Sequence, residues 1–181
     1  MTIKIQTKKC KNLTKSEMAL MNRARIKAWG KKQKKDYTKD YEPETLFFFV
    51  KEGKKVVSVG GLRPITIDYL GKRYNIKGIC HIIAIEKGKG YGRVLIEAII
   101  RYLKKTNKTG LGFCGPKVTG FYEKCGLRTK KDLVERFIYI NPITKKQIRD
   151  DGDGLYFEGK DKFISRVLKT KDIVYINVKH W

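Results

Sequence analysis

A glycine-rich segment with basic residues is the part of the sequence best suited to chemistry. It consists of Lys87, Gly88, Lys89, Gly90, Tyr91, Gly92 and Arg93. Glycine lets a backbone approach a ligand closely, and a helix that begins at such a turn directs partial positive charge toward it. Successive N–H groups and three cationic side chains would then face one ligand, which predicts a site for a phosphate or pyrophosphate. A turn without a ligand is the alternative interpretation.

The spacing of these glycines excludes two common phosphate-binding motifs at this position. A P-loop requires four residues after its first glycine and then Gly-Lys-Ser/Thr, which segment 87–93 does not provide. The dinucleotide-binding fingerprint requires Gly-x-Gly-x-x-Gly and an acidic residue about 20 positions later, and the segment does not match it.

The flanking residues predict which elements hold the turn. Residues 79–85 form a near-continuous apolar run rich in β-branched side chains, which is typical of a buried strand. After the turn, apolar residues recur at helical spacing: Tyr91, Val94, Leu95, Ala98, Ile99, Tyr102 and Leu103. The sequence therefore predicts a strand, a turn and an amphipathic helix with one face against a sheet.

Upstream of the turn, the sequence predicts a strand and a helix. Residues 2–7 alternate between polar and apolar side chains, as a half-buried strand does. Thr14 and Glu17 form a capping box that starts a helix, which ends near Trp29. Residues 31–44 are polar and lack periodicity, so they predict a loop or a broken second helix.

A β-meander is expected between this loop and the glycine turn. Residues 46–50 and 56–62 predict two strands, and Pro64 is expected to interrupt the second because proline cannot donate to a sheet ladder. A turn at 69–72 then leads into the strand 74–85.

Downstream of the amphipathic helix, residues 109–114 predict another short strand. Gly115 and Pro116 follow it and are expected to open a second helix. The expected apolar face of this helix, at i, i+3, i+4 and i+7, consists of Val118, Phe121, Tyr122 and Cys125.

Two of these segments resemble recurring motifs of the GNAT superfamily of N-acetyltransferases. The turn is similar to Arg/Gln-x-x-Gly-x-Gly/Ala, with Lys87 in the place of Arg or Gln, and with Gly90 and Gly92 in register. Phe-Tyr-Glu-Lys-Cys-Gly-Leu at 121–127 is close to the second motif, Phe-Tyr-x-x-x-Gly-Phe. Both motifs occur in the family's order.

The resemblance implies an α/β (α+β) fold whose central sheet is mixed, mostly antiparallel and flanked by helices. The sheet would splay between two parallel strands, 79–85 and 109–114, and so admit a coenzyme. One N-acetyltransferase domain would cover residues 1–181, with its core at about 45–140 and a C-terminal extension at about 141–181.

The resemblance also implies acetyl-CoA as co-substrate, without a metal, and roles for individual residues. Tyr122 occupies the position of the family's usual general acid; a core aromatic residue is the alternative. His81 lies on the strand expected to flank the thioester, and an unperturbed pKa near ~6.5 suits a general base. A core histidine, with water relaying the proton, is the alternative. The N–H groups of Ile83 and Ile85 would bind the pantetheine arm, and segment 87–93 would bind the pyrophosphate.

The C-terminal part resembles a narrower group, the aminoglycoside 2′-N-acetyltransferases. Asp-Asp-Gly-Asp-Gly at 150–154 leads into a predicted strand, and Trp181 is at the C-terminus. The expected acceptor-binding residues are Asp36 and Asp40 in the loop, together with Asp151 and Trp181. Aminoglycosides are polycations, however, and a chain with a formal net charge of +24 would repel them over most of its surface.

The charge of +24 has two interpretations. It indicates an anionic partner such as nucleic acid or the ribosome, or it reflects a lysine-rich composition spread over solvated faces. The sequence has no apolar run of the ~20 residues that span a bilayer and no apolar signal segment at its start, so a cytoplasmic protein without a membrane partner is expected. Four cysteines without Cys-x-x-Cys spacing predict neither a disulfide nor a zinc site.

Three functions remain open from the sequence. The first is acetyl transfer from acetyl-CoA to an amine-bearing small molecule, aminoglycoside- or polyamine-like, by a monomer or homodimer. The second is acyl transfer to amines of nucleic acid, the ribosome or other proteins. The third is a catalytically idle module that binds acyl-CoA. Lysines around the acceptor site would favour the second function, and carboxylates would favour the first.

Overall fold

The computed structural model describes residues 2–141 and 143–178, which group into two compact units. The first unit comprises residues 2–63 and 80–99, and the second comprises the other described residues. Three elements continue from one unit into the other: β3 (Lys55–Tyr69), β4 (Lys72–Ala84) and α2 (Tyr91–Thr106).

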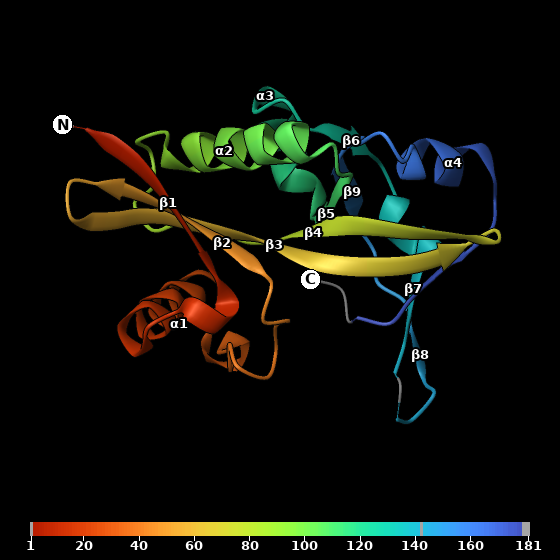
Figure 1. Cartoon of the computed structure of the whole chain (residues 1–181), viewed down its shortest axis with the longest axis horizontal. Helices are drawn as coiled ribbons and strands as arrows, with labels where there is room; N and C mark the ends of the chain where they lie inside the picture. The colour runs from red at the N-terminus through yellow and green to blue at the C-terminus, as the bar shows by residue number, and fades with distance from the viewer. Residues whose placement is uncertain (1, 142, 179–181) are drawn as a thin grey trace. The chain divides into compact units, whose positions relative to one another are not determined.

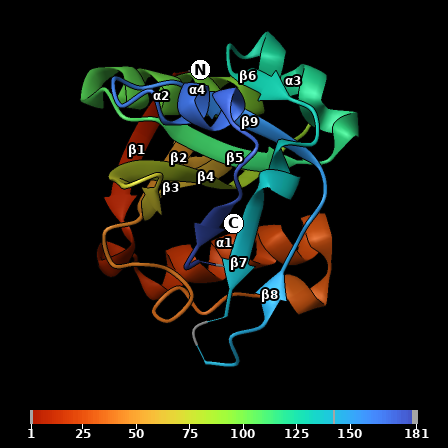
Figure 2. The same ribbon diagram turned by 90° about the vertical axis from the view of Figure 1, so that its right-hand side faces the viewer.

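The first unit contains the strand order β1-β2-β3-β4. β1 (Ile3–Lys9) pairs antiparallel with β2 (Leu46–Glu52), which pairs antiparallel with β3. α1 (Lys15–Trp29) lies on one face of this sheet and α2 on the other, as Figure 1 and Figure 2 show. Short 3-10 turns, η1 (Cys10–Asn12) and η2 (Lys31–Gln33), flank α1.

The start and end of α1 are confirmed by its capping residues. The Thr14 side chain accepts a hydrogen bond from the Glu17 N–H, and the Glu17 carboxylate accepts one from the Thr14 N–H, as in a capping box. Gly30 ends the helix with φ of +92°, a conformation that glycine adopts without strain. Met21 and Arg25 are among the buried residues of the helix.

The amphipathic face of α2 is confirmed as well. Within the first unit, its buried side chains are those of Tyr91, Leu95, Ile96, Ala98 and Ile99. The close contact with the sheet explains a glycine in β3: a Cβ at Gly60 would lie 2.6 Å from the side chain of Ile82 and 3.0 Å from that of Leu95.

The prediction that Pro64 interrupts its strand is wrong, because β3 continues from Lys55 to Tyr69. The pairing of β2 with β3 ends at the pair Leu46–Leu62, two residues before the proline. The missing N–H of Pro64 therefore costs no hydrogen bond to β2, which is the situation in which sheets tolerate proline.

The second unit contains the strand order β3-β4-β5-β9-β6. β5 (Gly110–Cys114) pairs parallel with β4 at Lys77–Gly110 and Gly78–Leu111, whereas β9 pairs antiparallel with both β5 and β6. The predicted mixed α/β sheet is thereby confirmed. The bounds of the two outer strands are Asp153–Phe157 for β9 and Arg128–Lys130 for β6.

A small sheet, with the order β10-β7-β8, belongs to the second unit too. Its strands are β7 (Phe137–Ile140), β8 (Gln147–Ile148) and β10 (Val174–Ile176). α4 (Phe163–Lys169) and the 3-10 turn η4 (Leu133–Arg136) complete this part of the chain. The core of the unit combines aliphatic and aromatic side chains, and the rings of Tyr74 and Phe163 pack with centroids 4.9 Å apart.

The predicted second helix is shorter than expected. Pro116–Val118 form the 3-10 turn η3, and α3 covers only Thr119–Lys124. A 3-10 turn has three residues per turn, so the helical spacing does not extend across the junction. The expected apolar face is therefore wrong in part, because Val118 and Phe121 are exposed while Cys125 is buried.

No helix among the described residues is long and apolar enough to span a membrane. The four cysteines are free thiols, and Cys10, Cys80 and Cys125 are buried.

Candidate functional site

The glycine turn has the backbone geometry that an anion site requires. Gly88 and Gly90 have φ of +80° and +77°, and a Cβ at either position would meet no atom within 4 Å. α2 begins at Tyr91, and the N–H groups of Arg93 and Val94 donate to the Gly90 carbonyl at 3.0 and 3.2 Å. Open backbone thus lies at the N-terminus of a long helix, where partial positive charge concentrates and a pyrophosphate fits.

The basic side chains of the turn do not have equivalent surroundings. Lys89 lies 3.1 Å from the Glu86 carboxylate, which also forms an ion pair with Lys55. Hydrogen bonds from Lys55 and Lys89 hold the pKa of the Glu86 carboxyl below its usual value. Lys87 is exposed, and Glu86 offsets part of the positive charge that the sequence suggested for the turn.

The first helical residues of the turn also differ from one another. The Tyr91 side chain is buried, and a hydrogen bond to Glu52 raises the pKa of its phenol. Tyr91 therefore anchors the helix, whereas Gly92 is half-buried and Arg93 is exposed on the first turn of α2.

The backbone of β4 next to the turn is already engaged with β3. The Ile85 N–H donates to the Val57 carbonyl at 2.9 Å, and the Ile83 carbonyl accepts a hydrogen bond from Ser58 Oγ at 2.9 Å. The Ile85 N–H is therefore not available to the pantetheine arm, contrary to expectation. Because alternate residues of a strand direct their backbone groups to opposite edges, those of Ile82 and Ala84 face away from β3.

His81 is held in an unusual position within β4. Its φ is +57°, which is rare for a residue other than glycine and recurs at functional sites. The imidazole is buried, and its Nδ1 lies 3.1 Å from Arg25 Nη1 and 3.5 Å from the Tyr37 hydroxyl. The rings of Trp29, Tyr37 and Phe47 surround it with centroids 5.7 to 6.4 Å away.

This environment keeps the imidazole of His81 neutral. Burial, and then the charge of Arg25, lower its pKa well below the usual value. The other ring nitrogen, Nε2, is buried and has no hydrogen-bond partner within residues 2–141 and 143–178. The sequence assigns Arg25 no role, because its contact with His81 joins residues 56 positions apart in the chain.

Tyr122 lies in the second unit, on α3. Burial, followed by the nearby thiols of Cys114 and Cys125, raises the pKa of its phenol to about 12, so the phenol keeps its proton at neutral pH. The helix turn that carries it is closed by a Schellman motif, in which Leu127 N–H donates to the Tyr122 carbonyl and Gly126 N–H to the Glu123 carbonyl. This accounts for the glycine in the segment 121–127.

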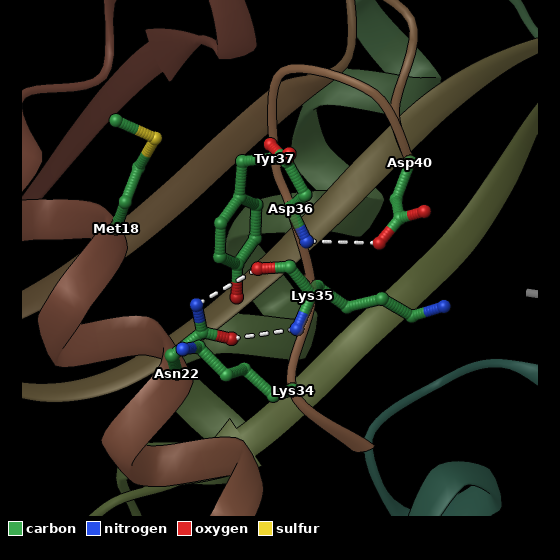
Figure 3. Close-up of a pocket in the computed structure, with 7 residues that line it drawn as sticks. All are labelled: Met18, Asn22, Lys34, Lys35, Asp36, Tyr37 and Asp40. Carbon is green, nitrogen blue, oxygen red and sulfur yellow. Dashed lines mark hydrogen bonds between the residues drawn. The ribbon is translucent and has the colours of Figure 1, made fainter. Parts of the chain in front are cut away.

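Two of the expected acceptor residues, Asp36 and Asp40, line one pocket of about 570 Å³ in the first unit. Figure 3 shows the pocket between α1 and the loop that follows it, with the Tyr37 ring at its centre. The other lining residues are Met18, Asn22, Lys34 and Lys35. The pocket therefore has both carboxylates, which favour a small-molecule amine, and lysines, which favour a macromolecular acceptor.

Hydrogen bonds hold the loop around this pocket in shape. The Asn22 amide donates to the Lys35 carbonyl at 2.8 Å and accepts from the Lys35 N–H at 2.9 Å. Asp40 Oδ2 accepts from the Asp36 N–H at 2.9 Å, and Asp36 Oδ1 accepts from the Thr38 hydroxyl at 2.6 Å. The bonds from Thr38 lower the pKa of the exposed Asp36 carboxyl, so it is ionised at neutral pH.

The other two expected acceptor residues are not part of this pocket. Asp151 is exposed and belongs to the second unit, and Trp181 lies outside the described residues. In the same Asp-rich segment, Asp153 has a structural role that the sequence did not indicate. This carboxylate is buried and accepts from the Thr119 hydroxyl at 2.9 Å and from the Asp132 N–H at 3.2 Å, so it fixes the start of α3.

The family model described as "Acetyltransferase (GNAT) family" matches residues 15–127, more than half of the chain. The chain belongs to the GNAT family. It is therefore an acyltransferase, and acetyl-CoA is the donor generally used in this family. Within the described residues, no group of His, Cys, Asp and Glu side chains is placed to hold a metal ion.

Solved structures share this fold at low sequence identity. Escherichia coli ElaA has a TM-score of 0.59 at 14% identity, covering 87% of this chain and 100% of its own. An acyl-CoA N-acyltransferase from Pseudomonas aeruginosa has a TM-score of 0.56 at 13% identity (84% and 97% covered). An N-acetyltransferase from Staphylococcus aureus Mu50 has a TM-score of 0.54 at 17% identity (87% and 98% covered). No curated protein matches the sequence.

Proposed function

We propose that this GNAT protein transfers an acetyl group from acetyl-CoA directly to a primary amine of a small molecule. The observation that carries the donor half is the glycine turn. Gly88 and Gly90 combine positive φ with open space in front of the backbone, at the N-terminus of α2. A pyrophosphate can approach such a backbone more closely than it could approach any residue with a side chain.

The acceptor half rests on the pocket next to α1. Its volume of about 570 Å³ lies in the range of small-molecule sites. The carboxylates of Asp36 and Asp40 would attract an ammonium group, while Lys34 and Lys35 balance their charge, so the lining is formally neutral. An amine of moderate positive charge therefore fits the pocket better than a strongly charged polycation.

The proton transfers can be assigned to residues of this chain. An amine must lose a proton before it attacks the thioester carbonyl, and the departing thiolate must gain one. We assign the second step to Tyr122, whose raised pKa keeps its phenol protonated as a donor. The first step was expected to use His81, but its imidazole is buried and its Nδ1 already faces Arg25 Nη1 at 3.1 Å.

The donor half is tested by placing a negative charge in the turn. Gly90→Asp sets a carboxylate against the pyrophosphate, and coenzyme A affinity in isothermal titration should fall by about a hundredfold or more, the scale of a like-charge contact. Gly90→Asn has the same shape without the charge and should lose much less. Gly71→Asp is the matched control, because Gly71 has φ of +73° and open space but lies in the β3–β4 turn. Unchanged affinity in Gly90→Asp would refute the site.

A further inference from the structure

The buried guanidinium of Arg25 has only neutral partners among the described residues. Its Nε donates to the Gln33 carbonyl at 2.7 Å, and its Nη2 approaches Gln33 Oε1 at 3.4 Å. The guanidinium lies 4.8 Å from the centre of the Trp29 ring, and Nη1 faces His81 Nδ1. A buried cation without a carboxylate partner is costly, and an anionic ligand near it would recover part of that cost.

The contact between Arg25 and His81 determines which nitrogen of the imidazole carries the proton. A guanidinium has only donors, so His81 Nδ1 must be the acceptor of this hydrogen bond. A neutral imidazole has one proton, which must then be on Nε2. His81 Nε2 is the atom that is buried without a partner, and it is therefore an N–H donor that lacks an acceptor.

We propose that Arg25 fixes His81 as an Nε2–H donor, and that this N–H binds an oxygen atom of the acceptor amine instead of removing its proton. The assignment of the ligand as the acceptor rests on the proposed function. Arg25 is a positioning residue in this arrangement, and His81 is the residue that contacts the substrate.

The location of His81 indicates the acceptor, not the coenzyme, as the ligand. Its imidazole packs against Trp29 of α1 and Tyr37 of the following loop, and the Tyr37 ring is also a wall of the pocket. Figure 3 shows this ring beside Asp36, whose carboxylate belongs to the same pocket. One substrate could therefore place its ammonium group at the carboxylates and an oxygen atom at His81.

This arrangement defines the class of substrate. A polyamine has no oxygen and would leave the N–H of His81 without an acceptor, which is costly in a buried site. The charge of Arg25 beside the imidazole favours a carboxylate over a hydroxyl. The preferred acceptor is thus an amine that bears a carboxylate, followed by one that bears a hydroxyl group.

One of the three aromatic rings around His81 is exposed. The Trp29 indole stands edge-on to the imidazole at 86°, and it is 48% exposed although it contacts a buried group. The rings of Tyr37 and Phe47 are buried, so Trp29 is the exposed one of the three aromatic neighbours.

The tautomer can be tested without any substrate. The chain has only two histidines, His81 and His180, so nitrogen-15 NMR of the imidazoles is assigned with a His180→Asn variant. We expect His81 to carry its proton on Nε2, with Nδ1 unprotonated, and to show no titration near pH ~6.5, the unperturbed value. Arg25→Met should release this state and mix the tautomers. A proton on Nδ1 in the wild type, or an imidazolium that titrates near neutral pH, would overturn the proposal.

The role of the N–H is tested with two amide replacements. The amide nitrogen of His81→Gln reaches the place of Nε2, whereas that of His81→Asn reaches only the place of Nδ1, and neither can act as a base. With carboxylate-bearing amines, His81→Asn should raise KM about ten- to a hundredfold, the range for a hydrogen bond to a charged group, and His81→Gln should raise it less. Equal losses in both variants would indicate that His81 removes the proton, which would overturn the proposal.

The choice of acceptors separates this inference from the proposed function. The panel compares an amine with a carboxylate, its hydroxyl analogue and a diamine of the same length without oxygen, each at matched coenzyme A saturation. We expect turnover to decrease in that order. Equal or better turnover of the diamine would overturn the substrate class while supporting acetyl transfer. If coenzyme A binds and no amine is acetylated, the proposed function and the acceptor assignment both fail, and the NMR result still decides the tautomer.

Discussion

His81 is buried and Tyr122 is half-buried, and removal from water disfavours the charged form of each side chain but shifts their pKa values in opposite directions. Burial and Arg25 lower the pKa of His81, so the imidazole has lost its second proton. Burial raises the pKa of Tyr122 to about 12, so the phenol has kept its proton. His81 has a charged partner that fixes its orientation. At Tyr122, the groups that raise the pKa in addition to burial are the thiols of Cys114 and Cys125.

The difference shows how two neutral titratable side chains can serve different tasks. A phenol with a raised pKa keeps its proton at any physiological pH and can donate it to a leaving thiolate. An imidazole that already accepts a hydrogen bond from a guanidinium has one task left, which is donation through Nε2. Neither side chain then takes the proton of the acceptor amine, so that step is left to water or to the carboxylates of the pocket.

The largest effect should come from removing the hydroxyl group of Tyr122. Tyr122→Phe keeps the ring, so coenzyme A affinity and packing should be retained, while kcat should fall by roughly ten- to a thousandfold, the scale of general acid catalysis. The measurement is steady-state turnover with the preferred acceptor. Tyr175→Phe, on the exposed part of β10, is the matched control. Full turnover in Tyr122→Phe would show that another residue or water donates the proton.

A smaller effect should appear in the way the free energy of unfolding depends on pH under acidic conditions. The folded pKa of His81 is lowered, so below pH ~6.5 the unfolded chain binds a proton that the folded chain does not, and stability falls as the pH falls. This group can contribute up to about 1.4 kcal/mol per pH unit. The free energy of unfolding of His81→Gln should therefore depend less on pH between about 6.5 and 5 than that of the wild type. The free energies are measured by urea unfolding at each pH. The same pH dependence in both proteins would contradict the burial of a neutral imidazole.

The smallest effect concerns the turn that holds Tyr122. Gly126 has φ of +95°, so Gly126→Ala should lower the free energy of unfolding by about 1 kcal/mol. Gly120 lies within α3 with open space around its Cβ position, and Gly120→Ala should raise stability slightly because alanine favours helix. Changes of the same sign in both variants, measured by urea unfolding, would contradict the Schellman motif as the reason for Gly126.

Features that depend on neighbouring residues in the chain were predictable from the sequence. The capping box of Thr14 and Glu17, the end of α1 at Gly30, the apolar face of α2 and the glycine turn all follow from local spacing. Each needs only a few consecutive residues to satisfy hydrogen bonds or to face a sheet, and the structure has them where they were expected.

Features that depend on distant residues were not predictable. The length of β2 determines whether Pro64 is tolerated in β3, and no local pattern reports that length. The contact of His81 with Arg25 joins residues 56 positions apart, and so the sequence suggested a general base where we propose a hydrogen-bond donor. The N–H of Ile85 was expected to bind coenzyme A, but it donates to the Val57 carbonyl. This pairing was not predictable, because strand register cannot be inferred from an apolar run alone.

The continuation of β3 past the end of β2 has a consequence for how the protein behaves at high concentration. A strand edge without a neighbour is a template on which another chain can add, and such edges lead to aggregation. On the β2 side of β3, this stretch begins with Pro64, which lacks a donor, and Asp68 near its end forms an ion pair with Arg73 of β4. The proline that looked like a strand breaker thus discourages strand addition by a second copy of the chain.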